Sequence, residues 1–350
     1  MRSLNEKQSL KQVVDLLGTL LGTQDHLTTS KSDSTGGNRL GYHPDLIIKS
    51  GDNLFVVECK NSAQLGNIST AVEQLSRYQS QWDNTIKLLA VPFMGESGMN
   101  KCAEAGISWI DLSGNADVSG PGLRLYVRGK ENKFKQPGRK ENIFAPKSSR
   151  IARRLLYHPE RAFTQRELAL ESGLGEGFVS RIVKTLEEQS LIIRTPEGRI
   201  TARNRSVLLD AWAQGYDFSK HDVLRGHVTG RSGEEILKKL HAAFKAMNME
   251  HAATGLGAAW LYAKFAAFRT VSYYLKEWPS DKELEEIGFR QDTAGANTWL
   301  IIPKDADVFH DIQTKNDVPC VHPIQVYLDL KNQPERADEA ATELRQMLEL

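Results

Sequence analysis

The spacing of apolar residues over the first 129 positions predicts alternating helices and strands. Apolar side chains recur with helical periodicity in the segments 4–21, 67–82 and 100–106. Apolar runs typical of buried strands fall within the segments 43–60, 86–93, 107–115 and 122–129. Residues 28–38 are polar and rich in Gly and Ser, and predict a loop. The alternation predicts an α/β domain with a mixed sheet over residues 1–129.

The middle of the chain has the pattern of three short helices followed by a hairpin. Helical spacing occurs in the segments 150–157, 164–172 and 176–189, and two short β runs, LIIRT and GRITA, follow. Thr164 and Glu167 form a capping-box pair, in which each side chain can bond the other residue's backbone N–H. Three helices, a tight Gly turn and a hairpin predict a winged helix-turn-helix over residues 148–204.

The remaining residues, 207–350, predict a domain that mixes helices and strands. Helical patterns occur in the segments 233–247, 254–268 and 322–348, the last as an amphipathic tail after Pro323. Apolar β runs fall at the segments 270–275 and 297–303. Asp305 and Asp307 follow a Pro, so we expect them in a solvated turn; the alternative for this acidic pair is a metal site.

Composition adds limits to this picture. At 350 residues the chain is long enough for two or three domains. The net charge of +1 provides no overall attraction to nucleic acid, so such binding must come from local clusters. Three widely spaced cysteines suit free thiols in a reducing compartment. Without a signal peptide pattern or a long apolar run, we expect a cytoplasmic protein that does not contact a membrane.

Residues 128–154 are strongly basic, with ten Lys or Arg against two Glu. Pro and Gly interrupt this stretch, which predicts a basic linker at residues 130–147. One interpretation is a solvated tether between domains. The other is a segment that contacts a DNA strand, since each neutralised phosphate adds salt-dependent affinity.

The apolar hairpin at residues 43–60 contains charges where Val or Thr would be usual. If Gly51 and Asp52 form a type II′ turn, the register places Asp45 opposite Glu58. Opposed side chains on one sheet face lie about 4.5–5.5 Å apart at Cβ, so two carboxylates there repel unless a cation lies between them. Lys60 shares their face because strand side chains alternate.

This pattern predicts a Mg²⁺ or Mn²⁺ site for hydrolysing phosphodiesters. Asp45 and Glu58 would bind the ion, and Lys60 would orient the attacking water or stabilise charge developing on the phosphate. Cys59 should face the other way. The alternative is a structural ion pair between Asp45 and Lys60 at a sheet edge, with Glu58 solvated.

The hairpin resembles the PD-(D/E)xK nuclease superfamily, whose motif would be Pro44-Asp45 followed by Glu58-Cys59-Lys60. Gln74 to Tyr78, QLSRY, resembles the QxxxY element of the RecB-type branch. The resemblance implies a restriction-endonuclease-like fold and a role for Gln74 and Tyr78 in positioning substrate beside the metal. It also implies an acidic metal ligand on the first helix, for which Glu6 is the candidate and Asp15 the alternative.

The middle segment resembles bacterial winged-helix regulators. The helix beginning at Glu176 would then enter the major groove with four residues facing outward, Gly177, Ser180, Arg181 and Lys184. We expect DNA contacts from Ser180, Arg181 and Lys184. Further contacts are expected from three basic residues outside this helix, Arg199, Arg139 and Lys140. The alternative is a module that makes protein contacts only.

The C-terminal part, with the winged helix, resembles AbiEi-like antitoxins of type IV toxin-antitoxin systems. This implies a nucleotidyltransferase-like α+β fold and a protein partner. The run TVSYYL carries no carboxylate, so we expect the fold without that chemistry.

Two functional hypotheses follow. The first is a Mg²⁺-dependent DNA endonuclease targeted by the winged helix, serving phage defence or mobile-element biology and acting as a homodimer. The second is a DNA-binding repressor or antitoxin whose nuclease fold is non-catalytic.

Overall fold

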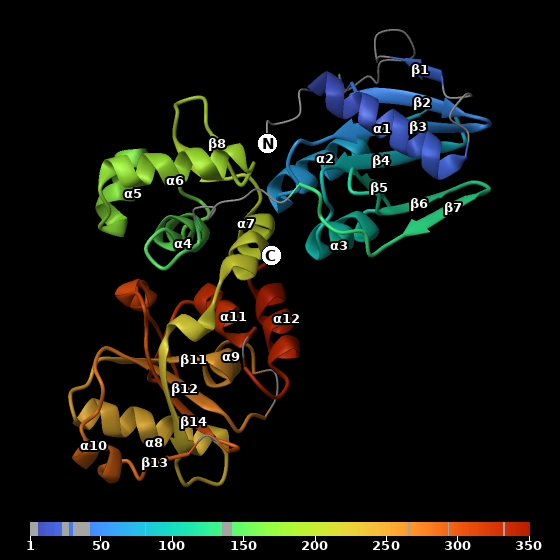
Figure 1. Ribbon diagram of the computed structural model, residues 1–350. Helices are drawn as coiled ribbons and strands as arrows, with labels where there is room; N and C mark the ends of the chain where they lie inside the picture. The colour runs from blue at the N-terminus through green and yellow to red at the C-terminus, as the bar shows by residue number, and fades with distance from the viewer. Residues whose placement is uncertain are drawn as a thin grey trace. The chain divides into compact units, whose positions relative to one another are not determined.

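The computed structural model describes residues 6–22, 28–30, 43–80, 82–134, 142–264, 267–292, 294–331 and 333–350, with side chains except at 6–8 and 30. The chain divides into two compact units. The first comprises residues 1–141 and 188–191, and the second comprises 142–187 and 192–350. Both contain helices and sheet, so the expected mixed α/β character is confirmed (Figure 1).

The first unit is built on a seven-stranded sheet in which neighbours in space are neighbours in sequence. Its strands are β1 (Thr28–Ser30), β2 (Leu46–Ser50), β3 (Asn53–Cys59), β4 (Thr85–Val91), β5 (Ser108–Asp111), β6 (Ala116–Gly120) and β7 (Leu123–Val127). Strands β3, β4 and β5 run parallel, and the other neighbours pair antiparallel. Strand β3 is therefore an interior strand.

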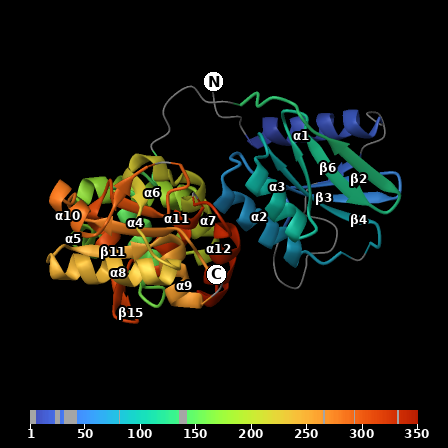
Figure 2. The same cartoon turned by 90° about the horizontal axis from the view of Figure 1, so that it is seen from below.

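Helices cover both faces of this sheet, as Figures 1 and 2 show. These helices are α1 (Glu6–Leu21), α2 (Leu65–Arg77) and α3 (Glu96–Glu104). Val13 and Leu17 of α1 pack in a buried cluster with Val57 on one face of β3. On the opposite face, Val56 packs in a second cluster with Leu75 of α2. The alternation along β3 thus separates two apolar layers.

Two strands of this sheet lie where the pattern did not predict them. Residues 28–38 were expected to form a loop, but Thr28–Ser30 pairs antiparallel with β2 as an edge strand. Strand β6 was also missed, because its sequence ADVSG lacks an apolar run. Pairing with β5 and β7 makes this segment a strand despite its weak pattern.

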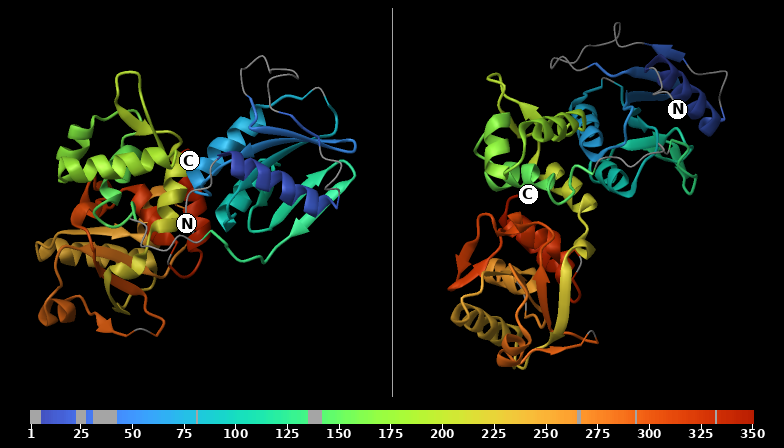
Figure 3. Two further views of the ribbon diagram at one scale, coloured as in Figure 1. Left: turned by 45° about the horizontal axis from the view of Figure 1, so that its top comes forward. Right: turned by 60° about the vertical axis from the view of Figure 1, so that its left-hand side comes forward.

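The first part of the second unit has three helices and a small hairpin. They are α4 (Ser149–Tyr157), α5 (Gln165–Ser172), α6 (Glu176–Glu188), β8 (Ile192–Arg194) and β9 (Ile200–Ala202). The capping box is confirmed, with the Thr164 hydroxyl accepting from Glu167 N and Glu167 accepting from Thr164 N. Figure 3 shows the β8–β9 hairpin, in yellow-green, projecting beyond the helices.

The rest of the second unit surrounds a second seven-stranded sheet, of order β13-β10-β14-β12-β11-β16-β15. Its strands are β10 (Asp222–His227), β11 (His251–Thr254), β12 (Val271–Leu275), β13 (Arg290–Gln291), β14 (Thr298–Ile302), β15 (Gln313–Lys315) and β16 (Val318–Cys320). Its helices are α7 (Arg205–Gly215), η2 (Phe218–Lys220), α8 (Gly233–Ala246), α9 (Gly255–Ala263), α10 (Asp281–Glu286), η3 (Ala306–Phe309), α11 (Pro323–Leu330) and α12 (Ala337–Met347).

Neighbouring tyrosines on β12 show that helices contact both faces of this sheet. The Tyr273 hydroxyl donates to Leu237 O of α8, and the Tyr274 hydroxyl donates to Asp329 of α11. Because successive strand side chains point to opposite faces, α8 and α11 lie on different sides.

Two helical predictions for this region were too long. Helix α9 ends at Ala263, since Lys264 adopts a left-handed backbone with φ of 52°. The expected C-terminal tail is two helices, α11 and α12, with Pro334 in the connection between them. A Pro cannot donate a backbone hydrogen bond and therefore interrupts a continuous helix. Among the described helices, none combines the length and hydropathy needed to span a bilayer.

Candidate functional site

The β2–β3 hairpin has the register predicted from its turn. Ser50 pairs with Asn53 and Ile47 pairs with Val56, so Asp45, just before β2, lies in register with Glu58. Gly51 has φ of 56°, a left-handed backbone that is strained for residues with a side chain. The first central residue of a type II′ turn requires such a positive φ. The turn chemistry therefore sets the face on which the charged residues lie.

Four polar side chains, Asp45, Glu58, Lys60 and Gln74, form what we call the hairpin cluster. Asp45 Oδ2 accepts a hydrogen bond from Cys59 N at 2.8 Å. Lys60 Nζ lies 2.6 Å from Glu58 Oε1 and 3.1 Å from Gln74 Oε1. The structure thus brings α2 and the end of β3 together around one ammonium group.

The burial of Glu58 contradicts the alternative interpretation of this hairpin. Glu58 is 3% exposed, on an interior strand, and pairs with Lys60. The alternative, a Lys60–Asp45 pair at a sheet edge beside a solvated Glu58, is therefore wrong. A buried carboxylate needs a compensating positive charge, and Lys60 supplies it here. Cys59 packs with the apolar cluster on the α1 side, opposite Glu58, as predicted.

Helix α1 was expected to supply a further metal ligand beside the hairpin cluster. Glu6 is the first residue of α1, and its side chain lies outside the described residues. The alternative ligand, Asp15, is exposed. The sequence reasoning did not single out Ser9, which is buried and whose hydroxyl donates to Asn61 Oδ1 at 3.3 Å, beside Lys60. The N-terminal part of α1 therefore lies near the end of β3.

Tyr78 is the last residue of the QLSRY sequence that begins at Gln74. It caps the C-terminus of α2 with an extended backbone, and its side chain is 7% exposed within the apolar cluster between α2 and the sheet. Burial raises the pKa of its hydroxyl.

Helix α6 has the two faces that its sequence predicts. Gly177, Ser180, Arg181 and Lys184 are exposed. The opposite face is buried, through Val179, Ile182, Val183 and Leu186. Phe178 is half-buried, and the Arg181 guanidinium lies 5.6 Å from its ring centroid.

The remaining predicted DNA contacts, Arg199, Arg139 and Lys140, lie outside α6. Arg199 donates to Ala162 O and forms an ion pair with Glu167 at 2.8 Å, which anchors β9 to the start of α5. Arg139 and Lys140 lie outside the described residues.

Helix α4 contributes a buried ion-pair cluster that we call the arginine clamp, Arg150, Arg153 and Arg154 with Asp305 and Asp307. Arg150 contacts Asp305 at 2.9 Å. Asp307 accepts from Arg153 at 3.0 Å and from Arg154 at 2.6 Å.

The arginine clamp corrects the expectation for Asp305 and Asp307. The two aspartates do not lie in a solvated turn, because their side chains are only 7% and 10% exposed. Their sequence resembles a polar turn, and only the approach of α4 buries them. Three of the ten basic residues in the stretch 128–154 likewise belong to a helix and neutralise buried carboxylates. The sequence could not reveal a pairing across about 150 residues.

A second buried polar network centres on Asp329 of α11. Its carboxylate accepts from the Thr254 hydroxyl at 2.5 Å, the Tyr216 hydroxyl at 2.5 Å and Gln325 Nε2 at 2.9 Å. Burial raises the pKa of Asp329, while these hydrogen bonds act in the opposite direction. Burial also raises the pKa of Tyr216 well above its usual value. Sequence reasoning missed this network because its members are far apart in the chain.

A small cavity of about 30 Å³ adjoins this network and is lined by Tyr216, His221, Lys220, Lys304 and Gln325, among others. This is more than the roughly 10–15 Å³ that a cavity needs to hold a water molecule. Strand β12 carries no carboxylate, so the paired acids of a nucleotidyltransferase are missing from that strand.

The architecture is that of a mixed α/β protein with separate sheets in its two units. A family model described as "Transcriptional regulator, AbiEi antitoxin, Type IV TA system" matches residues 199–349. The match covers β9 and all later elements, and confirms the expected similarity of the C-terminal part to antitoxin regulators. It does not include α6. Comparison with curated proteins and with solved structures finds no match.

Proposed function

We propose that this protein is a DNA-binding transcriptional regulator of the antitoxin type. The observation that carries the proposal is the exposed polar face of α6, formed by Ser180, Arg181 and Lys184, opposite a buried apolar face. Helix α5, the Gly turn and α6 have the order of a helix-turn-helix, and β8–β9 would be the wing. The family match to residues 199–349 supports a regulatory role.

The basic residues of the second unit would fall into two groups, those that stabilise the fold and those that contact DNA. Arg153 and Arg154 are 3% and 1% exposed and bind Asp307, so they join α4 to η3. Arg181 and Lys184, in contrast, are exposed on α6 and would meet the phosphates or base edges. A homodimer would match two half-sites of a palindromic operator, and the C-terminal domain would bind a protein partner.

The test is DNA binding by the variant Arg181→Ala/Lys184→Ala. We expect weaker binding to duplex DNA from upstream of the protein's own coding sequence, with a shallower dependence of log K on log salt, because phosphate contacts are lost. Arg231→Ala/Lys282→Ala, which removes the same two residue types from exposed positions elsewhere in the second unit, should bind like the wild type. Equal affinity and salt slope in both variants would remove α6 from the DNA interface.

A second candidate function is metal-dependent hydrolysis of phosphodiesters at the hairpin cluster. It is favoured by the buried Glu58 in register with Asp45, beside Lys60 and Gln74. Carboxylate oxygens suit Mg²⁺, which prefers oxygen ligands. Asp45 and Glu58 would hold the ion. When bound, Mg²⁺ activates water and neutralises phosphate charge.

The residues themselves would have separate roles in this chemistry. Lys60 would exchange its contact with Glu58 for one with the phosphate oxygen, and Gln74 would hold the ammonium group in place. Such an activity would suit phage defence or mobile-element biology, with the α4–α6 segment selecting the DNA.

The test of the second function is cleavage of plasmid and linear DNA with Mg²⁺ or Mn²⁺ and with EDTA. Asp45→Ala and Lys60→Ala should each abolish metal-dependent cleavage while DNA binding stays nearly intact. Asp52→Ala, at the exposed turn of the same hairpin, is the matched control and should cleave normally. If the wild type does not cleave, or if the two variants cleave as well as the wild type, the hairpin cluster is not a nuclease site.

A further inference from the structure

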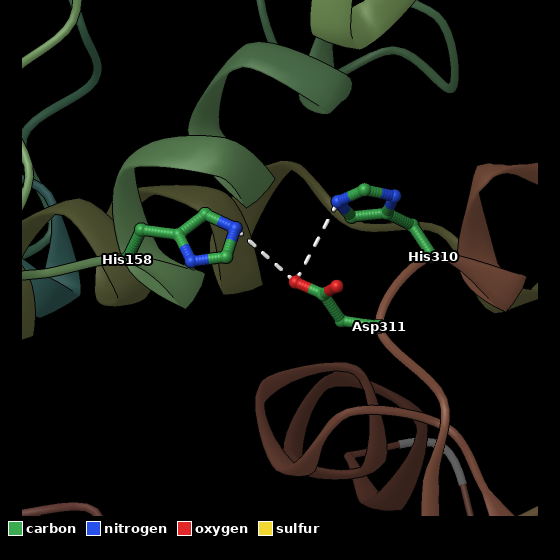
Figure 4. A group of neighbouring side chains, drawn as sticks. All are labelled: His158, His310 and Asp311. Atoms are coloured by element: carbon green, nitrogen blue, oxygen red, sulfur yellow. Dashed lines mark ion pairs between the residues drawn. The ribbon is translucent and has the colours of Figure 1, made fainter.

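Two histidines and an aspartate meet where the C-terminal end of α4 approaches the residues after η3. Figure 4 shows His158, from the cap of α4, and His310 both directed toward the Asp311 carboxylate. His158 Nε2 lies 3.2 Å from Asp311 Oδ2, and His310 Nε2 lies 3.5 Å from the same oxygen. We call these three side chains the histidine cluster.

The two nitrogen–oxygen distances in the histidine cluster match those between ligands of a tetrahedral metal ion. With bonds of about 2.0–2.1 Å to Zn²⁺, two ligands of a tetrahedral site lie about 3.3 Å apart. Both measured nitrogen–oxygen distances are close to that value, and one ligand atom from each residue lies within 4.8 Å of the others. An ion could therefore be bound with small side-chain adjustments.

The contacts that Asp311 makes with His158 and His310 are ion pairs. Among the described residues, no hydrogen bond is formed by the side chains of His158, His310 or Asp311, although the three groups converge. Their side chains are 30%, 33% and 38% exposed, so an ion can enter from solvent and water can fill a fourth position. Asp311 directly follows His310 in the chain and has a left-handed backbone, with φ of 56°. One short segment therefore supplies two of the three side chains.

Aromatic rings restrict the orientation of both imidazoles. Tyr157 stacks on His310 with ring centroids 6.4 Å apart and an interplanar angle of 15°. The His158 ring lies 6.3 Å from Phe163 and 6.5 Å, edge-on, from His310. Side chains held in this way lose less conformational freedom when they bind an ion.

We propose that His158, His310 and Asp311 bind one divalent transition-metal ion of the Zn²⁺ type. Two imidazole nitrogens and one carboxylate oxygen suit such an ion better than Mg²⁺ or Ca²⁺, which prefer sets made of oxygen. The ion joins the end of α4 to the segment after η3, the same two parts that the arginine clamp connects. This site is separate from the hairpin cluster and does not depend on the proposed function.

The test is Zn²⁺ binding to the full chain after removal of metal with EDTA, measured by calorimetry and by the visible absorption of Co²⁺. The wild type should bind one ion. The variant Asp45→Ala, which changes the hairpin cluster, should bind it too. His158→Ala, His310→Gln and Asp311→Asn should each weaken binding by more than about tenfold, since even changes beyond the direct ligands cost ~10–100-fold. His227→Ala changes a half-buried histidine elsewhere in the second unit and should leave binding unchanged.

Thermal unfolding provides a second readout. Zn²⁺ should raise the unfolding temperature of the wild type and of His227→Ala, because the ion binds only the folded arrangement, and should leave the three cluster variants unchanged. Circular dichroism checks that each variant is folded. Absence of Zn²⁺ binding by the wild type, or unchanged affinity in Asp311→Asn and His310→Gln, overturns the proposal.

Discussion

At the residue scale, the buried charges of this protein form ion pairs with partners that lie from two to about 150 residues away in the chain. In the first unit Lys60 pairs with Glu58 and donates to Gln74, and in the second unit Asp307 pairs with Arg153 and Arg154. Replacing one member of such a group leaves the others charged in a poorly solvated position. The free energy of unfolding therefore falls by more than the contribution of the lost contact. The size of the decrease depends on the charges that remain buried.

We expect Asp307→Asn to destabilise the second unit by about 3 kcal/mol, because two buried guanidinium groups lose their compensating charge. Urea unfolding followed by tryptophan fluorescence measures this change. Asp222→Asn, at an exposed position of β10, is the control and should change the free energy of unfolding by less than about 0.5 kcal/mol. Equal stability of Asp307→Asn and the control would mean that the arginine clamp contributes little.

At the scale of elements, turns and caps were predictable while helix ends were less so. Gly51 and Asp52 set the hairpin register, and Thr164 with Glu167 begins α5, because both signals depend on neighbouring residues alone. Helix α9 ends earlier than its apolar pattern indicates, at a left-handed Lys264. Strands β1 and β6 exist through pairing with neighbours, which local pattern cannot reveal.

The start of α11 predicts a dependence of stability on pH. His322 caps this helix by accepting from Ile324 N, and burial, with nearby positive charge, lowers its pKa to about 3. The unfolded chain, with a histidine pKa of about 6.5, then binds more protons between the two values, so stability falls as pH decreases from 6.5 to 3.

His322→Asn should keep the helix cap, since Asn is a favourable capping residue, and should remove this titration. We expect the loss of stability per pH unit to be smaller in the variant by up to ~1.4 kcal/mol, as measured by urea unfolding in EDTA at pH 7 and pH 4.5. Other buried histidines, including His221 and His251, keep part of the slope in both proteins. Parallel slopes would show that His322 is charged in the folded state.

At the scale of the whole molecule, the two compact units have different candidate roles. The first contains the hairpin cluster, whose proposed chemistry is hydrolysis. The second contains α6, the arginine clamp, the histidine cluster and the residues that match the antitoxin regulators. The α4–α6 segment and the C-terminal sheet belong to this same compact unit, so the proposed DNA-binding helix α6 and the C-terminal part are linked through the contacts of α4.

The sequence by itself determined the helices with strong periodicity, the hairpin register and the exposed face of α6. These features follow from local rules, namely 3.6-residue and two-residue periods, turn residues and caps. It also identified Glu58, Lys60 and Gln74, which the structure places in contact.

Only the tertiary structure decided which distant residues meet. It buried Asp305 and Asp307 against α4, surrounded Asp329 with hydroxyl groups and brought His158 to His310 and Asp311. These contacts join segments that lie up to about 150 residues apart, and no periodicity encodes them. They form because buried polar groups must find partners when the chain packs, and packing is a property of the whole fold.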